Sequence, residues 1–184
     1  MIGIYTIEEA KLYYLYMMAD GEVNGREWTK FDQICKELKI EPETEKEIIK
    51  DCKKSEEQSQ DLLNVIINEK IDEKAGRGLF GIQNVSSQAR IIWNLVDLGY
   101  ADREYSNEEK RIVNYLVDKW SVDPEILQEF VDIADTILAL TRQKSWIYNQ
   151  FPRGAERDKR EKKVDNQIME LLGDVKLTIK ELTM

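Results

Sequence analysis

The chain has 184 residues, of which 36 are acidic and 27 are basic, so its formal net charge is −9. Hydrophobic residues make up 42% of it and charged residues 34%, a balance typical of globular proteins. It contains no histidine, which excludes Ser-His-Asp and Cys-His hydrolases and His-ligated zinc enzymes. Its two cysteines cannot form a disulfide scaffold or a four-thiolate zinc site.

The N-terminal region lacks the features of a targeting segment. Its apolar run, residues 12–18, is short, has no basic residues at its start, and follows Glu8 and Glu9. No stretch of the chain approaches the roughly 18–20 apolar residues that a membrane-spanning helix needs. We therefore expect a cytoplasmic protein without a transmembrane segment.

In the first half of the chain the apolar residues recur at helical spacing. A capping box of Thr6 and Glu9 opens the first predicted helix, and a second capping box, of Asn24 and Glu27, opens the next one. Pro42 marks the start of a third helix. Each start signal stands directly before a helical apolar stripe, so the pattern predicts three helices here.

Residues 59–74 carry a fourth helical apolar stripe, and the glycine-rich segment Gly76–Gly81 follows it. This segment matches the letters of the GxGxxG dinucleotide fingerprint, but that fingerprint requires a strand before it. The segment follows a predicted helix instead. We interpret it as a flexible connector between the two halves.

The second half repeats the same order of elements. A helix is predicted from about Asn84, and a capping box of Ser106 and Glu109 opens the next one. Pro124 begins a long helix, and a final helix follows Pro152 and runs to the C-terminus. No strand is predicted, so the fold class is all-α, a helical bundle of about seven to eight helices.

An internal repeat with an offset of 82 residues relates the two halves. Ala19–Glu27 aligns with Ala101–Glu109, and Ile40–Glu43 aligns with Val122–Glu125, so the register includes a proline. The sequence therefore predicts two duplicated helix–acidic turn–helix units, at about residues 5–75 and 83–144, related by a pseudo-twofold axis. A C-terminal amphipathic helix follows them.

Each repeat places three carboxylates in and just after a turn between two helices. Hard cations such as Ca²⁺ and Mg²⁺ take several oxygen ligands from carboxylates, carbonyls and water. The turns can supply one such shell each, or a single shared shell if they face each other. The candidate ligands are Asp20, Glu22 and Glu27 in the first turn and Asp102, Glu104 and Glu109 in the second.

A structural interpretation of the same residues stays open beside the metal site. A capping box explains Glu27 and Glu109 without any metal, and the aspartates can stabilise a tight turn. Capping does not explain why Glu22 and Glu104 recur in both turns. The spacing is not that of an EF-hand, because neither turn has that loop's oxygen ligands and central glycine.

The segment Met18–Val23 followed by Glu27, repeated at Tyr100–Glu109, resembles the TerB-like family. This family includes the tellurite-resistance protein TerB and N-terminal domains of some membrane-anchored DnaJ-like co-chaperones. The resemblance covers roughly residues 5–140. It implies an all-helical fold of two similar units with the six acidic residues as metal ligands, and a role in stress response or tellurite resistance.

We divide the chain into a TerB-like domain, residues 1–144, and a C-terminal linker and amphipathic helix, residues 145–184. Residues 141–184 carry 10 basic and 7 acidic residues, and the interleaved charges favour a solvated helix face. The near-heptad apolar stripe of this segment docks on the chain itself or on another chain. The stripe consists of Val164, Ile168, Leu171, Val175 and Leu182.

Two functions follow from these patterns. The first is a non-enzymatic module whose acidic turns bind a divalent cation or a cationic partner, in a stress-response or membrane-associated complex. The second is a helical adaptor or oligomerisation protein that acts through its C-terminal helix, with no metal site. Nucleic-acid binding is not expected of so acidic a chain. Three tryptophans, Trp28, Trp93 and Trp120, and both cysteines fall on apolar helix faces, which favours the core over catalysis.

Overall fold

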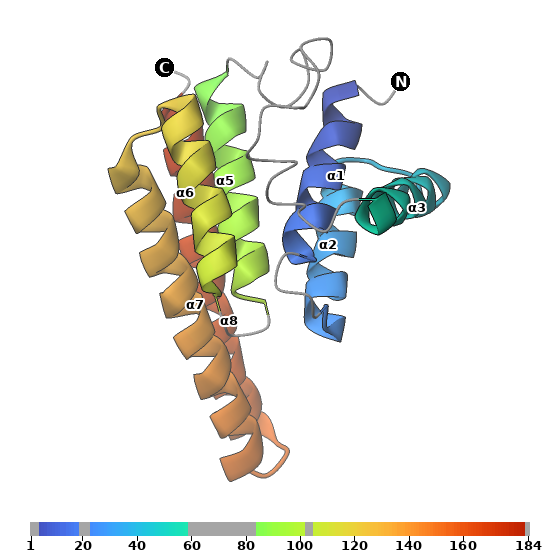
Figure 1. The fold of residues 1–184 in the computed structure, drawn as a ribbon. Helices are drawn as coiled ribbons and strands as arrows, with labels where there is room; N and C mark the ends of the chain where they lie inside the picture. Colours follow the sequence, from blue (N-terminus) through green and yellow to red (C-terminus); the bar gives the residue numbers. More distant parts are fainter. Residues whose placement is uncertain (1–3, 19–22, 59–83, 102–104, 183–184) are drawn as a thin grey trace.

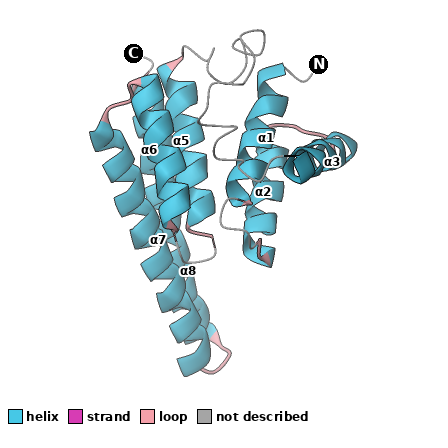
Figure 2. Cartoon of the chain, viewed as in Figure 1, coloured by secondary structure: helices cyan, strands magenta, loops and turns pink. Residues whose placement is uncertain are grey.

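The computed structural model describes residues 4–18, 23–58, 84–101 and 105–182. These ranges contain seven α-helices and no strand, which confirms the all-α fold class (Figure 2). The helices are α1 (Ile4–Met17), α2 (Gly25–Glu37), α3 (Pro42–Gln58), α5 (Val85–Gly99), α6 (Asn107–Trp120), α7 (Pro124–Gln150) and α8 (Ala155–Glu181). The helical stripe at residues 59–74 and the glycine-rich connector lie outside the described residues.

Side-chain caps begin four of these helices where the sequence predicts them. Asn24 and Ser106 each form a complete capping box, before α2 and α6. Asn84 caps α5 through the amides of residues 86 and 87, and Asp123 caps α7 with a proline at its first position. Each cap satisfies backbone N–H groups that the first turn of a helix leaves unpaired.

Helices α2 and α6 also end in the same way. The residues Lys39 and Ser121 adopt left-handed backbone conformations, with φ of 59° and 53°. After each of them, the next amide, from Ile40 or Val122, donates a hydrogen bond to the carbonyl five residues earlier, in the last helical turn. Both of these apolar residues are buried, so the reversal also anchors the following helix on the core.

Helix α5 lies at the centre of the molecule (Figure 1). It contacts α1 and α2 on one side and α6, α7 and α8 on the other, and nearly all of its residues from Gln88 to Gly99 are buried. Most of these buried residues are apolar, and the polar residues Asn94 and Asp97 have partners on the neighbouring helices α1 and α2. The first three helices therefore pack as a layer against a bundle of the last four, with α3 crossing α1.

The remaining core residues confirm several interpretations of the sequence. Cys35 and Cys52 are both free and buried. Trp93 is buried, and Trp28 and Trp120 pack half-buried against the core. Burial, with nearby Glu45 and Asp32, raises the pKa of Cys35 to about 12, so this thiol stays protonated at neutral pH.

Helices α7 and α8 form a long antiparallel hairpin whose free end projects beyond the other helices (Figure 1). The predicted final helix is confirmed, because α8 begins after Pro152 and runs to Glu181. The proposed boundary after residue 144 falls within α7, which continues to Gln150. The division of the chain into domains stays a prediction.

No helix in the described ranges is long and apolar enough to cross a membrane.

Candidate functional site

The structure describes two of the six candidate metal ligands. Glu27 and Glu109 lie in the first turns of α2 and α6. Asp20, Glu22, Asp102 and Glu104 lie outside the described residues. In the ranges 4–18, 23–58, 84–101 and 105–182, no three acidic or thiol side chains gather closely enough to hold a metal ion.

Glu27 and Glu109 close the capping boxes that the sequence predicts. The amides of Asn24 and Ser106 each donate to the Oε2 atom of the glutamate three residues later, at 2.8 Å in both cases. The glutamates are only 2% and 3% exposed. Their carboxylates therefore hold the helix starts directly after the two acidic turns, in equivalent positions of the repeat.

The helix ends that precede the two turns lie against each other. A Cβ atom at Gly99 would be 2.6 Å from the Tyr16 hydroxyl, 2.8 Å from the Tyr105 ring and 3.2 Å from Oε1 of Glu109. A larger residue at this position would displace the Tyr16 and Tyr105 side chains, so the last turns of α1 and α5 are in close contact here. In the sequence, each acidic turn follows its helix end by only two or three residues.

Tyrosines surround this junction and stay protonated. The rings of Tyr100 and Tyr105 stack at an angle, with centroids 5.1 Å apart. Burial and the charge of Glu109 raise the pKa of Tyr105 well above its usual value. Burial and Asp135 raise the pKa of Tyr100 to about 12. Both tyrosines therefore remain neutral hydroxyls at physiological pH, beside the Glu109 side chain.

An open groove of about 420 Å³ borders the same junction, between α2, α5 and α7. Arg26 and Lys30 line one wall, Asp97 and Tyr100 the second, and Ile137 belongs to the apolar side. Lys30 forms an ion pair with Asp97. Burial raises the pKa of Asp97, and the ion pair offsets this only in part. No sequence pattern indicates this groove, because its residues are far apart in the chain.

A buried polar network joins α1 to α5 and was not predicted from the sequence. Arg90 donates two hydrogen bonds to Glu9, from Nη1 to Oε1 at 2.6 Å and from Nη2 to Oε2 at 2.8 Å. The Tyr13 hydroxyl donates to Glu9 at 2.6 Å and accepts from Asn94 at 3.0 Å. The sequence offers one signal for it, a buried-face glutamate in α1, because such a charge requires a partner.

The C-terminal stripe lies against its own chain. Val164 and Val175 are 2% and 1% exposed, and Ile168 is half-buried. Leu171 and Leu182 pack half-buried against the main core. Helix α8 contacts both α7 and α5. Of the two docking modes that the sequence leaves open, the structure contains the intramolecular one.

Comparison with known protein families matches residues 7–132 to the family described as "Tellurite resistance protein TerB". This match covers more than half of the chain and includes both acidic turns. The chain belongs to the TerB family. No curated protein and no solved structure matches it. The family match confirms the resemblance that the repeated acidic turns carry, and it ends early in α7, before the free end of the hairpin.

Proposed function

We propose that this TerB-family protein is a non-enzymatic cytoplasmic module whose two acidic turns bind one divalent cation, Ca²⁺ or Mg²⁺. The contact of Tyr16 with Gly99 carries the proposal, because it joins the two helix ends from which the turns depart. Two short turns that leave adjacent helix ends can direct their carboxylates to a shared point. This favours one shared ligand shell over two separate ones.

The proposed ligands are Asp20, Glu22, Asp102 and Glu104. Glu27 and Glu109 each use one carboxylate oxygen to cap a helix, so we assign them to hold the turns in place. Ca²⁺ takes six to eight oxygen ligands in proteins, and Mg²⁺ takes six with several waters among them. One turn supplies two carboxylates apart from its cap, whereas two turns supply four.

Thermal unfolding of chelator-treated protein tests this assignment. A cation at about 100 times its Kd stabilises the folded state by about 2.7 kcal/mol, which raises the Tm of a chain of this size by roughly 5–10 °C. We expect the double variant D20N/D102N to lose this rise. A flat response of the wild-type protein to Ca²⁺, Mg²⁺ and Mn²⁺ would contradict the proposal.

Two control variants separate ligation from general charge and from capping. D118N/D174N removes the same two charges from exposed positions on α6 and α8 and should keep the response. E27Q should also keep it, because glutamine serves in a capping box. A response lost in either control would show that the turns are not the site, or that Glu27 is itself a ligand.

Stoichiometry distinguishes a shared shell from two shells. Titration calorimetry should give one ion per chain, and the single variant D20N should abolish binding. Two ions per chain, with D20N removing only one of them, would replace the shared site by one site in each turn.

The family description supports a role for this cation site in tellurite resistance or a related stress response. Deleting the gene should lower the tellurite concentration that the cells survive, and the wild-type gene should restore survival where the D20N/D102N gene does not. Equal rescue by both genes would separate the cation site from this role. An adaptor function through protein partners would then be the alternative.

A further inference from the structure

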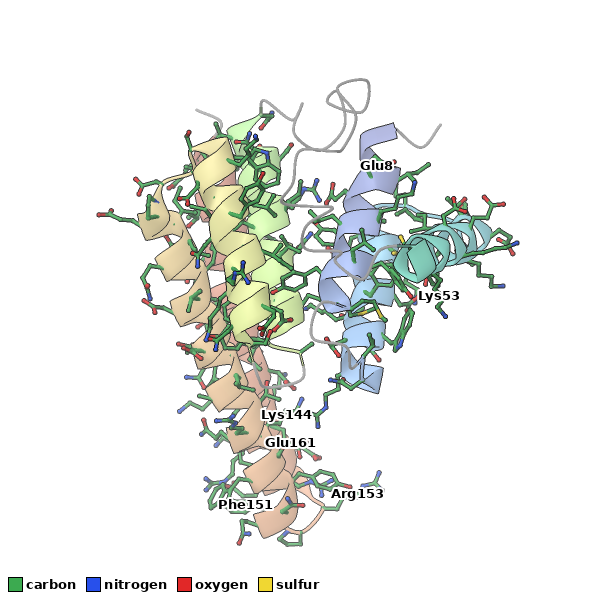
Figure 3. The ribbon with its side chains drawn as sticks, in the orientation of Figure 1. Glu8, Lys53, Lys144, Phe151, Arg153 and Glu161 are labelled. Carbon is green, nitrogen blue, oxygen red and sulfur yellow. The ribbon has the colours of Figure 1, made fainter. Side chains whose placement is uncertain are left out.

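The free end of the α7–α8 hairpin has a surface unlike the rest of the molecule. We call residues 142–165 the hairpin tip. Figure 3 shows Phe151 and Arg153 at its far end, with Lys144 and Glu161 closer to the body. The tip lies beyond the part of the chain that matches the TerB family, and the proposed cation site does not involve it.

The tip is basic, whereas the remaining chain is strongly acidic. It carries eight basic and four acidic residues, a formal charge of +4, against −13 for all other residues together. Ion pairs neutralise three of its acidic residues: Lys144 with Asp165, Arg157 with Glu161, and Arg160 with Glu156. Five basic side chains form no ion pair within the described residues. They are Arg142, Arg153, Lys159, Lys162 and Lys163.

The tip also exposes large aromatic side chains. Trp146 is 54% and Tyr148 62% exposed, while the other three tryptophans lie in or against the core. Ile147, between them, is 3% exposed, so the two rings flank the hairpin seam on opposite sides. They differ by only about 3 Å in height along the helix. Phe151 packs edge-on against Trp146, with ring centroids 5.9 Å apart.

We propose that the hairpin tip docks end-on into the surface of an anionic lipid bilayer. Tryptophan and tyrosine favour the interface between headgroups and acyl chains, because their rings are apolar with a polar edge. Lysine and arginine next to such rings bind anionic headgroups. The Trp146 and Tyr148 rings lie at one height along the hairpin axis and on opposite sides of it. This arrangement suits insertion of the hairpin end into the bilayer, and not a helix that lies flat on the bilayer surface.

The charge distribution of the whole chain selects this orientation. An anionic surface attracts the tip and repels the body, so the hairpin axis points toward the bilayer. Single-stranded nucleic acid fits less well. Arg157 covers the Tyr148 ring at 4.7 Å and Arg160 covers the Phe151 ring at 4.4 Å, and these guanidinium groups occupy faces on which a base would stack.

Vesicle flotation tests the docking. The full chain should bind vesicles of phosphatidylcholine with about one third phosphatidylglycerol, and not vesicles of phosphatidylcholine alone. Each basic residue near such a surface contributes about a fivefold gain in affinity, so R153Q/K159Q should bind roughly thirtyfold more weakly. The matched variant K50Q/K53Q, with both changes on α3, should bind as well as the wild-type protein.

Quenching by lipids brominated in their acyl chains tests the insertion itself. Trp146 should be quenched, and the variant W146F should lose the quenching because its other tryptophans remain in the body. Three results would each overturn the proposal. The first is quenching in W146F equal to that of the wild-type protein, and the second is an equal loss of vesicle binding in R153Q/K159Q and K50Q/K53Q. The third is binding that shows no preference for phosphatidylglycerol. Binding of a single-stranded RNA oligonucleotide in place of vesicles would also overturn it. Circular dichroism checks that each variant is folded.

Discussion

At the residue scale, a buried charge in α1 finds its partner in α5. The Glu9 side chain is 4% exposed and is held by two hydrogen bonds from Arg90 and one from Tyr13. Asn94 completes this network by donating to Tyr13. A buried carboxylate is tolerated only when its lone pairs are satisfied, so the network specifies how α1 and α5 are aligned.

We expect R90A to lower the free energy of unfolding by about 2–3 kcal/mol. It leaves the Glu9 carboxylate buried without its ionic partner, and the loss is at the low end for buried pairs because the Arg90 side chain is 38% exposed. Urea unfolding measures it. K36A, which breaks the exposed pair with Asp32, should cost much less, because water screens this pair. If R90A and K36A lowered the free energy of unfolding equally, burial of the Glu9 carboxylate would not explain the effect of R90A.

Asp97 should make stability depend on pH. Burial raises its pKa in the folded state above the ordinary value of 3.8, despite the ion pair with Lys30. Above pH 3.8 the folded state then binds more protons than the unfolded state, so this group's contribution to stability falls as pH rises. The stability difference between wild type and D97N, from urea unfolding, should shrink from acidic to neutral pH. An increase would contradict the raised pKa.

At the element scale, local motifs recur with the 82-residue offset of the sequence repeat. The capping boxes at Asn24 and Ser106 and the left-handed residues Lys39 and Ser121 occupy equivalent positions. Helices α2 and α6 therefore start and end by the same hydrogen bonds. This agreement concerns short segments. The pseudo-twofold relation between the two units stays a prediction.

We expect K39G and S121G each to stabilise the protein by about 0.5–1 kcal/mol. A left-handed conformation costs a residue with a Cβ atom roughly 1–2 kcal/mol, and the greater freedom of glycine in the unfolded chain offsets part of the gain. Chemical denaturation measures the change. K36G, within α2, should instead destabilise by about 1 kcal/mol. Destabilisation by both terminal variants would contradict the assigned backbone conformations.

Helix α8 has one buried and one exposed face, so truncation of neighbouring apolar residues should change the free energy of unfolding by different amounts. V175A should lower the free energy of unfolding by about 1–2 kcal/mol, because Val175 is 1% exposed. L177A should change it by less than about 0.5 kcal/mol, because Leu177 is 54% exposed. Urea unfolding of both variants checks this. A larger effect of L177A would place the other face of α8 in an interface.

At the scale of the whole molecule, burial concentrates on α5 and decreases toward the hairpin tip. Helix α5 contacts five other helices. The tip exposes most of its side chains and lies at the far end of the hairpin (Figure 1). Local opening requires less free energy where fewer apolar contacts must break. Stability should therefore vary strongly between these two regions of one folded chain.

Hydrogen exchange followed by mass spectrometry should detect this difference. Peptides from α5 should exchange slowest, with protection close to that of global unfolding, and peptides covering residues 145–160 should exchange much faster. Anionic vesicles should slow exchange in the second region if the tip docks on them. Equal protection of the two regions without vesicles would contradict the described packing.

The sequence predicts most of the helices and their starts, because a helix depends on signals within a few residues. The asparagine, serine and aspartate caps, the prolines and the apolar spacing at 3.6 residues all act on neighbouring backbone groups. The same local signals placed Cys35 and Trp93 on apolar faces, where the structure finds them buried. They also revealed the acidic repeat, and with it the TerB family.

Only the tertiary structure decided what these helices bring together. The contact of Tyr16 with Gly99, the pairing of Glu9 with Arg90 and the groove beside Asp97 each join residues more than 60 positions apart. No local pattern encodes such pairs, because they depend on how every apolar face in the chain packs against the others. By itself the sequence determined the helices and the acidic turns. The packing of α1 against α5 decided that the helix ends before these turns lie side by side.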